Sequence, residues 1–239
     1  MRVLLGSGGF RSEQRRENLR DEMQDFFGPS VSTILFIPYA LHDYDAYLAA
    51  MKQNGFDGGY ELVGIHEFPN AKKALEQAEA VYVGGGNSFR LIDTIHTEGL
   101  IEPMRDLVKA GLPYMGVSAG TNVACPSMMT TNDMPIVFPP SFESFGLVPY
   151  QVNAHYYGGQ IWVKHGEEFV EHFGETRQDR IREFHEMNAL PVVGLEEGAF
   201  LRNENGRVLL KHGSATLFRV GLDEKVLDSG FDITAALKG

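Results

Sequence analysis

Short apolar runs alternate with longer amphipathic stretches through the first half of this chain. Each apolar run is followed by a stretch in which apolar residues recur at helical spacing. This alternation predicts an α/β fold, built on a mostly parallel sheet with helices on both faces. The expected strands cover 3–5, 32–38, 60–65, 80–83 and 113–117, and the expected helices cover 13–27, part of 43–53, 71–79, 88–96 and 103–110.

The alternation of apolar runs and amphipathic stretches becomes irregular in the second half of the chain. Residues 130–159 are rich in Pro, Asn, Ser and Gly, so we expect mostly loop there, apart from a strand at 148–153. A helix is predicted at 176–187, with Thr176 as N-cap and Asp179 three residues later. A strand follows at 192–195, and 199–202 and 207–211 predict a C-terminal β-hairpin. Because we find no internal repeat or linker, we expect one domain spanning 1–239.

Charge excludes one broad class of partner. The 239-residue chain carries a formal net charge of -11. A nucleic-acid-binding surface needs an excess of Lys and Arg, so we expect no nucleic-acid partner. The same charge repels anionic small molecules at long range. An acidic substrate would therefore need a dedicated cation close to the site.

Cysteine usage and hydropathy favour a cytoplasmic protein. Cys125 is the only cysteine, which rules out a disulfide within the chain and fits a reducing compartment. The apolar run at the N-terminus is too short for the core of a signal peptide and is typical of a first strand. No apolar run approaches the length of about 20 residues that crosses a bilayer, so we expect no membrane association.

A possible nucleophile follows one of the expected strands. Parallel sheets bind ligands beyond the carboxyl ends of their strands, so the residues after 83 and 117 are of first interest. Residues 116–120 read Gly-Val-Ser-Ala-Gly, which matches G-x-S-x-G between a strand and a helix. Such a turn holds its serine in a strained and exposed position, and small neighbours avoid clashes. Ser118 is therefore a candidate nucleophile, with a glycine-rich phosphate or packing turn as the alternative.

A run of glycines follows another expected strand. Residues 84–87 read Gly-Gly-Gly-Asn, and such glycines allow backbone N–H groups to approach one point. For acyl transfer we assign the N–H groups of Gly86 and Ala119 to the oxyanion hole. A nucleotide-phosphate loop is the alternative, but neither G-x-G-x-x-G nor G-x-x-x-x-G-K-[ST] is present. The opening glycines at 6–9 also fail the dinucleotide pattern, because Arg11 occupies its last glycine position. We expect no cofactor.

A serine nucleophile needs a base. Of the eight histidines, His155 stands out, because it follows an expected strand and lies in a loop rich in Gly and Tyr. His165, Glu168 and His172 could share one helix face and suggest a metal site. An acidic solvated face explains that run more simply, so we expect no metal.

Six segments carry a family resemblance: 84–89, 118–122, 130–136, 153–155, 174–177 and 194–198. Together they resemble the peptidase E family of α-aspartyl dipeptidases, which are serine peptidases. They occur in the family's order from the first strand to about the C-terminal hairpin, so the resemblance covers nearly the whole chain. Taken together they are far more specific than any one alone.

The resemblance implies a class I glutamine-amidotransferase-like fold with a Ser–His–Glu triad. Ser118 would be the nucleophile, His155 the base and Glu197 the residue that orients the imidazole. Class I amidotransferases use a cysteine as nucleophile, so the serine here disfavours glutamine hydrolysis. The sequence departs from the family at Ala154, where proline is usual. Glu196 is an alternative third member, but the family pattern places a glycine after the glutamate, which favours Glu197.

Specificity for aspartate requires a cation for the substrate side chain. The resemblance favours Arg177 as a bidentate carboxylate clamp. From the residues alone, an exposed arginine paired with Glu175 or Asp179 is equally compatible. For the free α-ammonium of the substrate, Asp133 is a candidate acceptor with Asn87 assisting. Asp133 could instead only stabilise its own turn.

Three other functions remain open at this point. A cyanophycinase-like hydrolase of aspartyl polymer would share Ser118 but need an open cleft. A non-catalytic amidotransferase-like binding domain would carry an inert serine. An α/β-hydrolase esterase would need a histidine near the C-terminus, where His212 is the only candidate. The expected partner is a small dipeptide with N-terminal aspartate, and a homodimer is left open.

Overall fold

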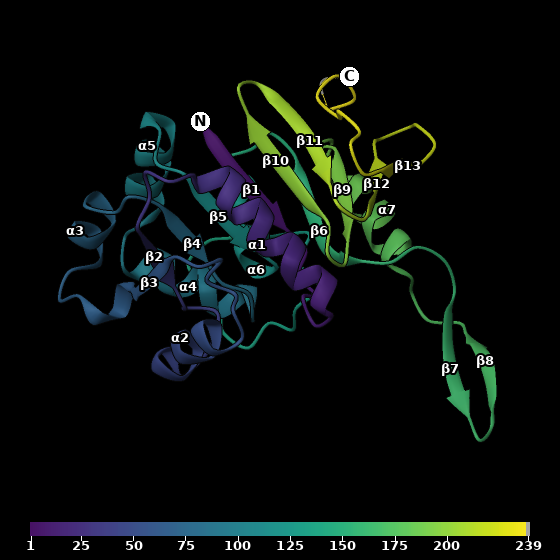
Figure 1. Cartoon of the computed structure of the whole chain (residues 1–239). Coiled ribbons are helices and arrows are strands. Elements are labelled where there is room, and N and C mark those ends of the chain that lie inside the picture. Colours follow the sequence, from purple (N-terminus) through teal and green to yellow (C-terminus); the bar gives the residue numbers. More distant parts are fainter. Residues whose placement is uncertain (238–239) are drawn as a thin grey trace.

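Five parallel strands and one antiparallel hairpin form the larger sheet of the computed structural model, which describes residues 1–237. The strand order is β11-β10-β1-β5-β4-β2-β3, and β10 and β11 extend the sheet at the β1 edge (Figure 1). These strands are β1 (Arg2–Gly6), β2 (Thr33–Ile37), β3 (Glu61–Gly64), β4 (Val81–Val83), β5 (Tyr114–Val117), β10 (Phe200–Glu204) and β11 (Arg207–Lys211).

Helices cover both faces of this sheet because alternate strand residues point to opposite sides. Leu4 and Met115 pack with residues of α1 and α2 in one hydrophobic cluster, whereas Leu5 and Tyr114 pack with residues of α3 to α6 in another. The helices are α1 (Glu13–Phe27), α2 (Tyr44–Gln53), α3 (Ala71–Glu76), α4 (Ser88–Thr97), α5 (Ile101–Ala110) and α6 (Ala119–Ala124), with a 3₁₀ turn at Ile65–Glu67.

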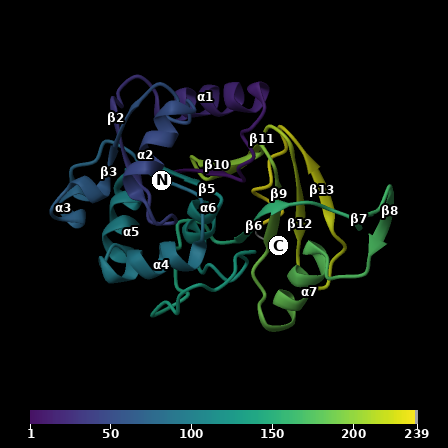
Figure 2. The same cartoon turned by 90° about the horizontal axis from the view of Figure 1, so that it is seen from below.

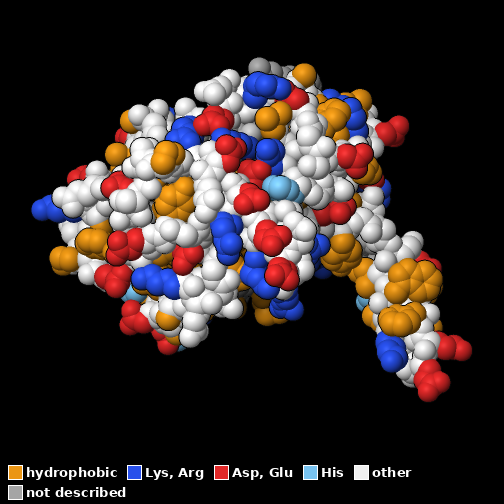
Figure 3. Space-filling view, in the orientation of Figure 1, with side chains coloured by type: hydrophobic (Ala, Val, Ile, Leu, Met, Phe, Trp, Pro, Cys, Tyr) orange, Lys and Arg blue, Asp and Glu red, His pale blue; other side chains and the backbone are white. Residues whose placement is uncertain are grey.

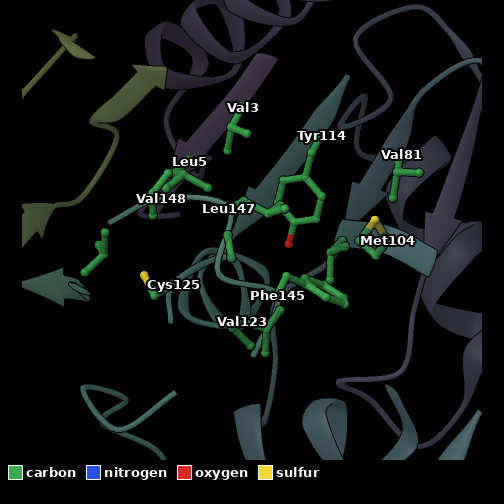
Figure 4. Close-up of a cluster of buried hydrophobic side chains, with 14 of the residues drawn as sticks. Val3, Leu5, Val81, Met104, Tyr114, Val123, Cys125, Phe145, Leu147 and Val148 are labelled. Carbon is green, nitrogen blue, oxygen red and sulfur yellow. The ribbon is translucent and has the colours of Figure 1, made fainter. Parts of the chain in front are cut away.

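The second cluster anchors the short helix α6 beneath β1 and β5. Val123 and Cys125 are fully buried against Leu147 and Val148, which come from the long loop after α6 (Figure 4). The hydroxyl of Tyr114 donates to the carbonyl of Gly120 at 2.6 Å, tying the strand to the helix that follows it. This packing fixes the start of α6 relative to β5.

A second sheet lies beside the first, with strand order β13-β12-β9-β6. Strands β6 and β9 are parallel, and β12 is antiparallel to β9. Helix α7 packs on this sheet, where Ile181 joins Tyr156, Val192 and Phe218 in a small cluster. The elements are β6 (Gln151–Tyr156), α7 (Arg177–Met187), β9 (Val192–Glu196), β12 (Ser214–Phe218) and β13 (Lys225–Asp228).

An antiparallel pair of strands extends away from the body of the molecule between β6 and α7. It consists of β7 (Ile161–His165) and β8 (Glu168–His172), and both views show it projecting from the molecule (Figures 1 and 2). Figure 3 shows hydrophobic side chains on its surface. Trp162 of β7 and Phe169 of β8 are exposed. The expectation that His165, Glu168 and His172 share a helix face is therefore wrong.

The α/β class, the parallel strands and the C-terminal hairpin are confirmed. Helix α1 has the expected bounds, but the strand expected at 148–153 runs from Gln151 to Tyr156. The strands do not form the single sheet expected from the pattern: β6 and β9 pair with each other in a second sheet, and β7 and β8 form a separate pair. No helix within residues 1–237 is long and apolar enough to cross a membrane.

Candidate active site

The turn between β5 and α6 has the geometry that its glycines permit. Ser118 has φ 55° and ψ -113°, a strained conformation for a residue other than glycine. A Cβ atom on Gly116 would collide with the backbone of Gly120, and one on Gly120 would collide with the carbonyl of Val83. Both glycines of the motif are therefore required by close approach of the backbone.

Two side chains align behind Ser118. His155 Nε2 lies 2.8 Å from Ser118 Oγ, and His155 Nδ1 lies 2.7 Å from Glu197 Oε1. Both distances are within hydrogen-bonding range, and the serine, imidazole and carboxylate are partly exposed. The ring can accept a proton from the hydroxyl at Nε2 while its Nδ1–H donates a hydrogen bond to the carboxylate. This arrangement suits activation of a nucleophilic oxygen.

Pairing of β6 with β9 brings the histidine and the glutamate together. His155 lies at a register shift between Ala154 and Tyr156 and has φ 55°, so its side chain leaves the regular alternation of the strand. Glu197 directly follows the end of β9, and it is Glu197 rather than Glu196 that contacts the imidazole.

The loop after β1 packs against the same two side chains. A Cβ atom on Gly8 would lie 2.8 Å from His155 Cε1, and one on Gly9 would collide with Glu197. Sequence reasoning considered these glycines only as a failed dinucleotide pattern. Two adjacent glycines after a first parallel strand were the available signal, because a ligand or another side chain often approaches such a position closely.

His212 lies away from the nucleophile. Its Nε2 atom is 3.2 Å from Glu22 Oε1, and its ring is edge-on to that of Phe200. Because the histidine bonded to Ser118 is His155, the arrangement of an α/β-hydrolase with a C-terminal histidine is not present.

The glycine loop after β4 lies next to the nucleophile. A Cβ atom on Gly85 would lie 3.0 Å from Ser118 Cβ, whereas the neighbours of Gly86 are Ala40 and Leu41. The hydroxyl of Tyr47 donates to the carbonyl of Gly85 at 2.9 Å, and burial raises the pKa of Tyr47 to about 12. Tyr47 therefore remains a neutral hydrogen-bond donor that holds this loop.

Asp133 and Asn87 make structural hydrogen bonds at the start of α4. Asp133 Oδ2 accepts from both the N–H and the hydroxyl of Ser88 at 2.7 Å. Asn87 is the N-cap of the helix: its Oδ1 accepts from Arg90 N, and its Nδ2 donates to the carbonyl of Met134. These bonds fix the 130–134 loop against α4. They explain both side chains without a ligand, although one carboxylate oxygen of Asp133 takes no part in them.

Arg177 is a half-buried cation without an acidic partner within residues 1–237. Glu175 pairs with Arg180 and Asp179 pairs with Arg182, so neither expected partner holds Arg177. Its guanidinium lies 5.5 Å from the centroid of the Tyr157 ring, and its buried Nε has no hydrogen-bond partner. Burial lowers its pKa, the nearby Arg180 contributes in the same direction, and Tyr157 and Asp133 act in the opposite one.

Alternative chemistry at other residues has little support. Burial raises the pKa of the Cys125 thiol to about 12, so it stays protonated at neutral pH and is a poor nucleophile. Within the described part of the chain, no three His, Cys, Asp or Glu side chains are grouped so that they could hold a metal ion.

Comparisons with known proteins place the chain in a family. A family model described as Peptidase family S51 matches residues 3–211. "Peptidase E" of Streptomyces coelicolor is 47% identical over 98% of this chain and 94% of its own length. "Probable alpha-aspartyl dipeptidase" of Drosophila melanogaster is 39% identical over 99% of this chain and 97% of its own length.

A solved structure supports the fold. The crystal structure of a peptidase from an acI-B1 Actinobacterium aligns with a TM-score of 0.63 at 16% identity, covering 97% of this chain and 96% of that one. At such low identity the likeness concerns the fold alone. The family model and the two relatives, which cover nearly the whole chain, carry the assignment: this chain belongs to peptidase family S51.

Proposed function

We propose that this peptidase is a serine dipeptidase that hydrolyses the peptide bond after an N-terminal aspartate. The observation that carries the proposal is the continuous contact from Ser118 Oγ to His155 Nε2 at 2.8 Å and from His155 Nδ1 to Glu197 Oε1 at 2.7 Å. The name of the Drosophila relative, probable alpha-aspartyl dipeptidase, supports the substrate class.

The triad follows the general mechanism of serine hydrolases. His155 takes the proton of Ser118 as the serine oxygen attacks the scissile carbonyl, and Glu197 stabilises the imidazolium that forms. The protonated imidazole then donates its proton to the leaving amine, which departs and leaves an acyl-enzyme on Ser118. Water, deprotonated by His155, resolves the ester and restores the serine.

The oxyanion would be held by backbone N–H groups on either side of the serine. We propose Ala119 N–H and Gly86 N–H as donors, with the neighbouring Gly85 providing the close approach to Ser118 that a side chain would prevent. Loss of one such donor typically costs about 3–4 kcal/mol of barrier.

Arg177 would bind the carboxylate of the aspartyl side chain. An arginine that is half buried, lacks an acidic partner among residues 1–237 and lies near Tyr157, two residues after His155, is available for an incoming anion. The net charge of -11 repels acidic substrates from a distance, and such a cation would attract their carboxylate close to the site. Asp133, with one carboxylate oxygen outside its bonds to Ser88, would accept the α-ammonium, and Asn87 would assist.

The triad also suggests that 1–239 acts as one catalytic domain. Ser118 follows a strand of the larger sheet, whereas His155 lies in β6 and Glu197 directly follows β9, two strands of the smaller sheet. Neither sheet alone carries a complete triad.

The test is hydrolysis of Asp-Leu by the wild-type protein beside Ser118→Ala, with Glu-Leu and N-acetyl-Asp-Leu as control substrates. We expect cleavage of Asp-Leu only, and its loss in Ser118→Ala. A folded wild-type protein that leaves Asp-Leu intact would contradict the proposal. Cleavage of an aspartyl polymer instead would favour a cyanophycinase-like hydrolase, and no reaction with any substrate would favour a binding domain.

A further inference from the structure

A single buried hydroxyl connects the strands that carry the base and the acid of the proposed triad. Ser7 directly follows β1 and is fully buried. Its Oγ donates to the carbonyl of Leu195 at 2.8 Å and accepts from the N–H of His155 at 2.9 Å. Its own N–H donates to the carbonyl of Ala199 at 3.0 Å, which fixes the residue from the opposite side.

Both partners of this hydroxyl lie where the smaller sheet departs from regular pairing. The β6–β9 ladder runs from Gln151 to Ala154 and then shifts register, leaving His155 in a left-handed conformation. An extra residue at such a bulge loses its place in the ladder, so its N–H needs another acceptor. Ser7 supplies that acceptor. Leu195, whose carbonyl accepts from the Ser7 hydroxyl, lies on β9 and precedes Glu197 by two residues.

The rest of the loop reinforces the contact. The N–H of Gly198 donates to the carbonyl of Gly8 at 2.8 Å, and Gly8 and Gly9 pack against His155 and Glu197. The loop after β1 therefore touches the base, the acid and the backbone on both sides of the acid. Because β1 and β5 are adjacent in the larger sheet, this loop also links those residues to the strand that leads to Ser118.

We infer that Ser7 is a positioning residue for catalysis: its hydroxyl holds the backbone of His155 in the left-handed conformation that directs the imidazole at Ser118. This inference rests on the proposed function of the triad. Ser7 has no hydrogen bond to the imidazole, to Glu197 or to Arg177, so it acts through the backbone, at the N–H of His155 and the carbonyl of Leu195.

The consequence of removing this hydroxyl is specific. In Ser7→Ala the His155 N–H and the Leu195 carbonyl lose the serine hydroxyl as a hydrogen-bond partner. Because buried polar groups without a partner raise the free energy of the folded state, the backbone around His155 is expected to move. A displacement of about 1 Å at a reacting group costs about 10²-fold in rate. Groups that bind the substrate are not displaced directly. We therefore expect kcat to fall about 10²-fold, with KM changed by less than about threefold.

The experiment measures two quantities for purified full-length protein. One is kcat and KM for Asp-Leu, and the other is the rate at which a fluorophosphonate inactivates Ser118, which reports nucleophile activation without the dipeptide. The variants are Ser7→Ala and Ser7→Cys, because the thiol retains a weak donor and acceptor. The matched control is Tyr150→Phe, which removes a fully buried hydroxyl bonded to Asn203 Oδ1 at 2.7 Å, just before β6.

Ser7→Ala is expected to lose kcat and the inactivation rate in parallel, Ser7→Cys to lie between it and the wild type, and Tyr150→Phe to keep wild-type kcat. If Ser7→Ala does not fold, the same parallel loss in Ser7→Cys carries the test. A folded Ser7→Ala or Ser7→Cys with wild-type rates, or with a raised KM and unchanged kcat, would overturn the inference. A wild-type protein that neither cleaves Asp-Leu nor reacts with the fluorophosphonate would refute the proposed function instead.

Discussion

The nucleophile and the residues behind it are built in two different ways. Ser118 is positioned by its immediate neighbours in sequence, since the strand, the two glycines and the helix all lie within residues 114–124. His155 and Glu197 are 42 residues apart and meet because β6 and β9 pair in parallel. A local turn can thus be recognised as a motif, whereas the base and acid depend on pairing that only the folded chain reveals.

The largest expected effect on kcat comes from changing Glu197, the residue that supports His155. Glu197→Gln leaves the size of the side chain unchanged but removes the charge that stabilises the His155 imidazolium and allows the wrong tautomer. We expect kcat for Asp-Leu to fall about 10³- to 10⁴-fold with KM nearly unchanged. Glu196→Gln, one residue away and not bonded to His155, is the matched control. Equal activity of the two variants would contradict the assigned third member.

A substitution in the turn that carries Ser118 should lower both activity and the stability of the fold. A Cβ atom on Gly120 would collide with the carbonyl of Val83, which belongs to a buried strand. We expect Gly120→Ala to lower the free energy of unfolding by about 1–3 kcal/mol and kcat by about 10²-fold. Denaturant titration and steady-state kinetics measure both effects. Gly158→Ala is a control, because that glycine has no positive φ and a Cβ atom there would make only an ordinary contact with Tyr156 at 3.6 Å. Wild-type stability and activity in Gly120→Ala would show that the turn tolerates displacement.

Arg177 offers a sharper test, because its substitution should slow cleavage of the aspartyl substrate without slowing the reaction of Ser118 itself. Arg177→Met keeps the length of the side chain but removes the charge. We expect kcat/KM for Asp-Leu to fall about 10- to 10²-fold, in line with the loss of a charge-assisted bidentate contact. Inactivation of Ser118 by a fluorophosphonate, which lacks the aspartyl carboxylate, should change little. Arg180→Met, which removes the arginine paired with Glu175, is the control. An equal loss of Asp-Leu cleavage and of inactivation would show that Arg177 supports the structure rather than specificity.

The smallest expected effect concerns the helix that carries Arg177. Asp179 accepts hydrogen bonds from the hydroxyl and the N–H of Thr176, and these bonds lower its pKa. A carboxyl whose pKa is lowered by folding contributes stability above its unfolded pKa, near 3.8, and loses it as pH falls through the folded value. We expect Asp179→Asn to lower the melting temperature by about 2 °C at pH 7 and by less below pH 3. A difference that grows as pH falls would contradict this.

The predictable part of the fold was the part set by local pattern. The alternating runs identified the strands of the larger sheet, and the capping residues Thr176 and Asp179 identified the start of α7. The division into two sheets was missed, because nothing in the sequences of β6 and β9 states that they pair with each other. The projecting β7–β8 pair was mistaken for a helix, since its charged and aromatic residues leave both faces exposed and give no strand alternation.

The site shows the same division. Ser118 followed from its motif and His155 from its place after an expected strand, whereas Glu197 came from the resemblance to a family. The structure places His155 within hydrogen-bonding distance of the other two. The loop at Ser7, Gly8 and Gly9 was missed, because its role depends on contacts with residues about 150 to 190 positions away. Such contacts leave no local periodicity or spacing to read.

The central claim is that Ser118, His155 and Glu197 act as one unit. The most direct measurement is kcat for Asp-Leu in Ser118→Ala, in His155→Ala and in the double variant, with folding of each checked by circular dichroism. Residues of a triad are strongly non-additive, so the double variant should be no slower than the slower single variant. Losses that multiply in the double variant, or a His155→Ala enzyme with wild-type turnover, would contradict the account.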